Sequence, residues 1–335
     1  MGKRIGRHTV KIDKPLYIVS ASSFVGKKEG EGPLKDYFDY VSDDVMFGEK
    51  SWEKAESKFF KSAFSSAIEK SGKKPDDMNY MLAGDLLNQC GGSTYGLRDL
   101  KIPFLGIYGA CSTFGEAVSL GSMLIDGGFA ENIVCGAGSH FCSAEKQFRF
   151  PLELGTQRPP TSTWTVTGAG AVVLSTSGFG PKVTYVTTGK IVDMGVKDAA
   201  NMGAAMAGAA CDAIAAHFKE TRRTTDYYDV VATGDLGTTG KAIIKKYLAE
   251  ENLMFDGNLT DCGIEIFDSE KQDTHSGGSG CACSAVTFSG YYYKLLMEKK
   301  IKNILLIPTG ALMNTTVSQQ GESIPSIAHA VAIEM

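Results

Sequence analysis

The chain contains two similar segments separated by a constant spacing of 150 residues. Residues 62–86 and residues 212–236 both read as a helix, a loop and a strand that ends in Gly-Asp-Leu. Without any gap, the Gly-Asp-Leu of residues 84–86 aligns with that of residues 234–236. Helices that alternate with strands through short loops are typical of a mainly parallel sheet covered by helices. The repeat therefore predicts a duplicated α/β chain.

Further segments extend this repeat. A helix at residues 112–126 leads to a strand in the first half, and a helix at residues 281–298 does so in the second. We therefore place the halves at residues 1–180 and 181–335, packed as one compact unit. Residues 200–219 are nearly all small, which indicates a helix packed tightly between two sheets rather than at the surface. Together these elements predict a layered sandwich.

One cysteine occupies a position of chemical interest. In Tyr-Gly-Ala-Cys-Ser-Thr-Phe-Gly, residues 108–115, Cys111 lies between an apolar strand at 102–108 and a helix of small residues. A thiol at a helix N-terminus meets unpaired N–H groups and the positive end of the helix dipole, which favour the thiolate and attract anions. Cys111 is therefore a nucleophile or the floor of an anion pocket, and an inert packed thiol is the remaining alternative.

Bulk composition excludes several classes of protein. Thirty-four basic and 38 acidic residues give a net charge of −4, which argues against a nucleic-acid-binding protein. The eight cysteines show no Cys-x-x-Cys pair, so the sequence predicts no metal site of its own and suits a reducing compartment. The basic N-terminus lacks an apolar signal region, and no apolar run reaches transmembrane length. These features predict a cytoplasmic protein.

Three motifs, together with Cys111, resemble the thiolase superfamily. Residues 168–174, Gly-Ala-Gly-Ala-Val-Val-Leu, look like the strand that closes the first half of third-class ketoacyl synthases. Residues 229–236 occupy the place of the strand and turn that carry the family's catalytic histidine. Residues 275–284 resemble the turn that carries its catalytic asparagine. The resemblance implies a thiolase-like αβαβα sandwich built from two duplicated βα halves.

The chain departs from this family at the positions that carry chemistry. A condensing enzyme needs a cysteine nucleophile with a histidine and an asparagine that polarise the oxyanions. Here the histidine position reads Gly234-Asp235 and the asparagine position reads Gly278. His275 and His329 are the alternatives that could substitute in principle, although neither lies at a family position for this role. We therefore expect no catalytic residues and no enzymatic activity, with Cys111 a vestigial nucleophile.

A narrower resemblance suggests a function. Residues 108–115, 273–281 and 321–329 look very like the stage V sporulation protein AD family of endospore-forming bacteria. The resemblance implies a non-enzymatic protein that binds dipicolinic acid, alone or as its calcium chelate, for uptake into developing spores and release in germination. It also implies a homodimer through residues 103–108. Membrane proteins of the same spore transport assembly would then hold it, as a peripheral protein of the cytoplasm or forespore, at the spore inner membrane.

The expected ligand site combines backbone donors, small residues and polar side chains. Dipicolinate is a flat aromatic dianion, so its carboxylates need donors and its ring needs a wall without bulky side chains. No cofactor is expected. The candidate ligand-binding residues are Cys111, Ser112, Thr113, Asp235, His275, Gly277, Gly278 and Ser279.

Several of these residues have plainer interpretations. Asp85 and Asp235 share the Gly-Asp-Leu pattern, so a turn-capping role for both is the alternative to ligand contact by Asp235. His275 reads as a hydrogen-bonded loop residue as readily as a ligand contact. Arg149 and Arg158 are expected to be solvated rather than to guard a pocket mouth.

Two other functions remain open at this point. An acyltransferase or hydrolase using Cys111 would carry an acyl group on that thiol. A pure scaffold would recruit membrane subunits through its surface while its pocket binds nothing. A measurement of dipicolinate binding distinguishes the hypothesis of a dipicolinate-binding protein from the enzyme and from the scaffold.

Overall fold

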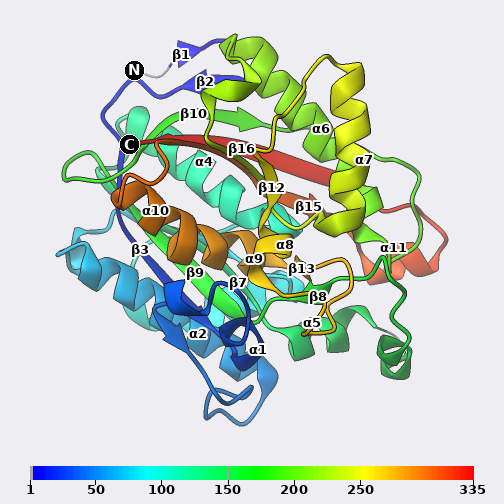
Figure 1. The fold of residues 1–335 in the computed structure, drawn as a ribbon. Helices are drawn as coiled ribbons and strands as arrows, with labels where there is room; N and C mark the ends of the chain where they lie inside the picture. Colours follow the sequence, from blue (N-terminus) through cyan, green and yellow to red (C-terminus); the bar gives the residue numbers. More distant parts are fainter. Residues whose placement is uncertain (1–2, 150) are drawn as a thin grey trace.

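Two layers of strands, each with five main strands and joined edge to edge into one hydrogen-bonded sheet, alternate with three layers of helices in the computed structural model, which describes residues 3–149 and 151–335 (Figure 1). Each half of the chain contributes one layer, here called the first and the second sheet. The αβαβα sandwich implied by the resemblance is confirmed. The two halves meet where β10 of the second sheet pairs with β3 of the first, at Lys182 and Tyr17.

The first sheet has a mixed strand order. Along the sheet its strands are β3 (Tyr17–Val25), β9 (Gly168–Ser175), β7 (Asn132–Ser139), β5 (Tyr80–Gly84) and β6 (Phe104–Gly106). β7, β5 and β6 are parallel neighbours, whereas β9 runs antiparallel to β3 and to β7. β6 forms the edge of this sheet within the described residues, and the homodimer through it stays a prediction.

The second sheet repeats this order. Along the sheet its strands are β10 (Lys182–Thr188), β16 (Ser326–Glu334), β14 (Asn303–Ile307), β11 (Val230–Thr233) and β12 (Leu259–Asp261). β14, β11 and β12 are parallel neighbours, and β16 is antiparallel to β10 and β14. The 150-residue repeat therefore corresponds to a real structural duplication. The predicted boundary at residue 180 falls in the turn between β9 and β10.

The helices form two outer layers and one inner layer. α2 (Trp52–Lys70), capped by Ser51, covers the outer face of the first sheet with α3 (Gly91–Leu97). α6 (Met202–Thr221) and α7 (Gly237–Glu250) cover the outer face of the second. Figure 1 shows α4 (Thr113–Asp126) and α9 (Cys281–Val286) between the two sheets.

Shorter elements complete the chain. They are β1 (Lys3–Arg4), β2 (Thr9–Lys11), β4 (Tyr40–Val41), β8 (Trp164–Thr165), β13 (Gly278–Ser279), β15 (Thr309–Ala311), α1 (Lys27–Gly30), α5 (Phe141–Phe148), α8 (Cys262–Ile266), α10 (Tyr293–Met297) and α11 (Thr315–Gln319). β8 and β13 pair in parallel beside the site described below.

The placement of α6 corrects one prediction. The small-residue helix lies in an outer layer against β16 and α7, not between the two sheets. Its small residues serve a close helix–helix approach instead. A Cβ atom on Gly240 of α7 would lie 2.7 Å from the carbonyl oxygen of Gly203 in α6, so neither backbone leaves room for a side chain there.

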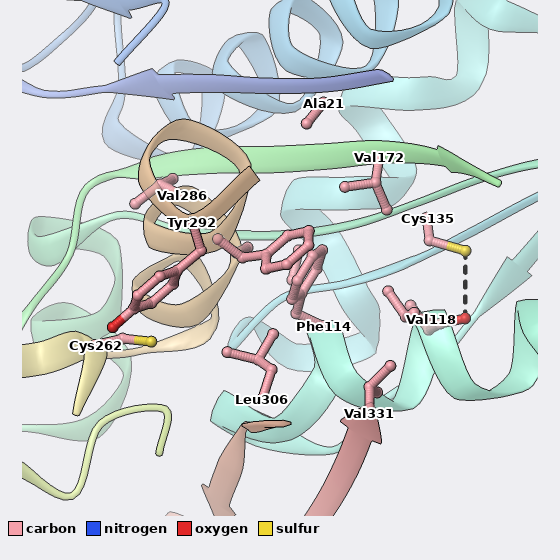
Figure 2. Close-up of a cluster of buried hydrophobic side chains, with 14 of the residues drawn as sticks. Ala21, Phe114, Val118, Cys135, Val172, Cys262, Val286, Tyr292, Leu306 and Val331 are labelled. Carbon is pink, nitrogen blue, oxygen red and sulfur yellow. Dashed lines mark hydrogen bonds between the residues drawn. The ribbon is translucent and has the colours of Figure 1, made fainter. Parts of the chain in front are cut away.

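The inner layer fills the space between the sheets with apolar side chains. Phe114 of α4 is fully buried, and Figure 2 places it between Val172 of the first sheet and Leu306 and Val331 of the second. Its ring packs against that of Phe288 at 5.8 Å between centroids. This core fixes α4, and hence the turn that precedes it, relative to both halves.

Candidate functional site

The turn before α4 holds Cys111 in a constrained geometry. Ala110 has a left-handed backbone, with φ of 49°, which is costly for a residue with a Cβ. A 3-10 turn over Ala110–Ser112 then leads into α4. Ser112 Oγ donates to the carbonyl oxygen of Gly109 at 2.7 Å, and Thr113 Oγ1 donates to that of Ala110 at 2.6 Å. The two hydroxyls therefore brace the turn.

The expectation of a stabilised thiolate at Cys111 is wrong. Burial raises the pKa of the Cys111 thiol well above its usual value, and the nearby Asp235 and Cys281 add to the shift. The amides of Ser112 and Thr113, expected to bind an anion, donate instead to the carbonyl oxygens of Gly109 and Ala110. Desolvation outweighs the helix dipole here, so Cys111 is a neutral thiol.

Asp235 lies beside this thiol. Its Oδ2 accepts hydrogen bonds from Ser279 Oγ at 2.9 Å and from the Gly280 amide at 3.1 Å, and Ser279 Oγ lies 4.0 Å from Cys111 Sγ. Its Oδ1 is buried and has no hydrogen-bond partner among the residues that the model describes. Burial raises the pKa of Asp235 to about 7, with a smaller contribution from Asp261.

The structure decides against a turn-capping role for Asp235. Asp85 does cap its own turn, because it accepts from the amides of Leu87 and Ser93 at 2.9 and 2.7 Å. After Asp235, the amide of Gly237, which corresponds to that of Leu87, donates instead to Asp261 at the end of β12 at 3.1 Å, and the amide of Leu236 donates there at 2.8 Å. Asp261 thereby frees Asp235 to reach across to Ser279 and the neighbourhood of Cys111.

A pocket opens above this cluster. Its cavity volume is about 90 Å³, which is small for a ligand-binding site. Cys111, Ser279 and Gly280 contribute buried surface to it, and Met202 and Met206 of α6 form an apolar wall. The pocket therefore combines a buried polar floor with an apolar side wall.

The predicted site residues separate into two groups. Cys111, Ser279 and Asp235 come together at the floor, with Asp235 behind Ser279. Gly278 does not face the thiol, because a side chain there would point at Ile266, 2.9 Å away.

The other candidates lie outside the pocket lining. Ser112 and Thr113 are fully buried in the turn, and Gly277 adjoins the backbone of Gly263. His275 is paired with Asp273, with 3.2 Å between Nε2 and Oδ1.

Arg158 and His329 both lie away from the pocket lining. Arg158, expected to be solvated, has a side chain only 15% exposed that pairs with Asp273 and lies over the Trp164 ring. His329 is a buried residue of β16, and burial lowers the pKa of its imidazole to about 4, so it is neutral. Neither residue lines the pocket.

Sequence reasoning missed most of the pocket wall. Glu145 and Arg149 line it from the end of α5, and Met313 lines it from the loop after β15. Arg149 was expected to be solvated, yet its side chain is only 26% exposed. The paired charges four residues apart, one in α5 and one directly after it, were the available signal, but nothing local indicated that this segment borders a pocket.

The part of the chain that the model describes contains no group of three or more His, Cys, Asp or Glu side chains arranged to hold a metal ion. In residues 3–149 and 151–335, no helix is both long and apolar enough to cross a membrane.

Several solved structures share this fold. AbyA1, a tetronic acid condensing enzyme, matches with a TM-score of 0.60 and 14% identity, over 95% of this chain and all of that one. Cerulenin-bound OleA of Xanthomonas campestris matches with a TM-score of 0.61 and 12% identity, over 96% of this chain and 97% of that one. The 3-oxoacyl-[acyl-carrier-protein] synthase III of Aquifex aeolicus matches with a TM-score of 0.54 and 12% identity, over 96% of this chain and 100% of that one. At these identities the likeness shows the thiolase-like fold alone.

Sequence comparison gives a narrower answer. The chain is 44% identical over 332 residues to Stage V sporulation protein AD of Bacillus subtilis strain 168, covering 99% of this chain and 98% of that protein. The family model for Stage V sporulation protein AD matches residues 6–334. With the thiolase-like fold and the pocket at Cys111 in place, this chain belongs to the Stage V sporulation protein AD family.

Proposed function

We propose that this protein binds dipicolinic acid, or its calcium chelate, in the pocket above Cys111 and performs no chemistry on it. The observation that carries the proposal is the pocket itself, whose floor joins a neutral thiol to a carboxylic acid in place of a nucleophile and its base. Membership of a sporulation family supports the choice of a spore metabolite as ligand.

The floor argues against thioester condensation. Such a reaction develops negative charge on a carbonyl oxygen, which donors must stabilise. Asp235 is acceptor-only when ionised, and Ser279 Oγ already donates to it at 2.9 Å. The thiol is protonated and lacks a histidine partner in the pocket lining.

In our proposal the protein works with membrane proteins of the spore to load dipicolinic acid and to release it in germination.

Calorimetric titration with dipicolinate, with and without calcium, tests this proposal. We expect saturable binding to the wild-type protein, and a loss of about tenfold or more in affinity for Ala199→Phe, because Ala199 lies in a half-buried loop that lines the pocket and the added ring would occupy the ligand's space. Ala216→Phe is the matched control, since Ala216 is a half-buried α6 residue outside the lining. Thermal unfolding of both variants checks that they fold.

Absence of dipicolinate binding in both conditions would contradict the proposal. Equal affinities for wild type and Ala199→Phe would show that the ligand binds elsewhere. A covalent acyl group on Cys111 after incubation with an acyl-CoA, read by intact mass, would instead indicate an acyltransferase.

A further inference from the structure

The pocket contains one pair of opposite charges. Among the described residues that line it, Glu145 has the one carboxyl group and Arg149 the one guanidinium group. They lie four residues apart at the end of α5, and Arg149 Nε donates to Glu145 Oε2 at 3.1 Å. Their side chains are 18% and 26% exposed, so the pair is partly shielded from solvent on the pocket wall.

The contact leaves most of the guanidinium group unused. A guanidinium group has five N–H donors in a planar fork, and its two terminal nitrogens match the two oxygens of a carboxylate. Within residues 3–149 and 151–335, Nε is the one side-chain nitrogen of Arg149 that donates a hydrogen bond. The terminal nitrogens can therefore donate hydrogen bonds to a second carboxylate without a change of fold.

The floor of the pocket makes such a cation necessary for an anionic ligand. Asp235 lies behind Ser279 with an unpartnered carboxyl oxygen, and Glu145 neutralises the charge of Arg149. A dianion that entered this pocket would meet no net positive charge unless Arg149 turned from Glu145 to the ligand.

We propose that Arg149 is the carboxylate anchor of the pocket and that Glu145 is a built-in competitor, which holds the guanidinium group until a dicarboxylate replaces it. The inference rests on the proposed function, because it assumes an anionic ligand in this pocket. It assigns to this site a specificity for aromatic carboxylates over neutral aromatic rings.

Titration of dipicolinate into Arg149→Gln tests the anchor. We expect a loss of about tenfold or more in affinity, the usual contribution of a charge-assisted hydrogen-bonded pair. Arg158→Gln is the matched control, because Arg158 pairs with Asp273 outside the pocket lining. We expect its affinity to equal that of the wild type within about twofold.

Glu145→Gln provides an independent test in the opposite direction. Removal of the competing carboxylate should tighten dipicolinate binding by about threefold to tenfold, a gain that a misfolded variant cannot mimic. Wild-type affinity in both Arg149→Gln and Glu145→Gln would overturn the anchor while leaving dipicolinate binding intact. Failure of the wild-type protein to bind dipicolinate would overturn both this inference and the proposed function.

Discussion

Replacing Asp235 by asparagine is expected to remove one distinct component of the pH dependence of stability. Burial raises the pKa of Asp235 to about 7 in the folded protein, whereas the unfolded chain has an ordinary value of about 4. Between these values the folded protein holds a proton that the unfolded chain has lost, so stability falls as the pH rises from about 4 to about 7. Above pH 7 the penalty is constant.

Chemical denaturation at pH 5 and at pH 8 measures this effect. From pH 5 to pH 8 the free energy of unfolding of the wild type should fall by about 2–3 kcal/mol more than that of Asp235→Asn. Because each protein is compared with itself at the two pH values, any loss of stability that the amide causes equally at both values cancels. Asp76→Asn, which alters an exposed carboxylate, should keep the wild-type pH profile. An identical profile in Asp235→Asn would show that this carboxyl is not held protonated.

Cys111 is expected to react slowly with alkylating agents. The residue is 8% exposed, and the pKa of its thiol is raised well above the usual value by burial and by Asp235, so little thiolate is present at pH 8. An activated cysteine would have a pKa lowered to about 3.5–7.5 and would be largely thiolate. The two alternatives therefore differ in rate by at least about 100-fold.

Time-resolved labelling with iodoacetamide, followed by peptide mass mapping, reads this rate residue by residue. We expect Cys111 in the folded protein to react at least about tenfold more slowly than in the chain unfolded in guanidinium. The half-buried Cys142 serves as an internal reference for reagent access. Labelling of Cys111 before every other cysteine would contradict the neutral-thiol account and favour an enzyme.

The layered fold was predictable because its signal is repeated. The Gly-Asp-Leu segment at residues 84–86 starts with the last residue of β5, and the segment at residues 234–236 directly follows β11. β5 and β11 occupy equivalent positions in the two halves of the strand order. The position of α6 was not predictable from its composition. Small residues indicate close packing, but they do not say whether the helix lies between two sheets or, as here, between one sheet and α7.

The site was predictable only where the local sequence determines it. Asp85 and Asp235 have the same neighbours, yet they differ because Asp261, 26 residues further along the chain, takes over the capping of the second turn. The protonation state of Cys111 was misjudged for a similar reason. Local sequence shows the helix start, whereas the burial and the nearby Asp235 carboxyl that reverse its effect come from the tertiary structure.

A crystal structure of the protein with dipicolinate tests the central claim most directly. The account predicts the planar ligand above Cys111 and Ser279, with a carboxylate within hydrogen-bond distance of the Arg149 guanidinium group and no covalent bond to the Cys111 sulfur. Dipicolinate bound elsewhere on the molecule, or an acyl group attached to Cys111, would contradict it.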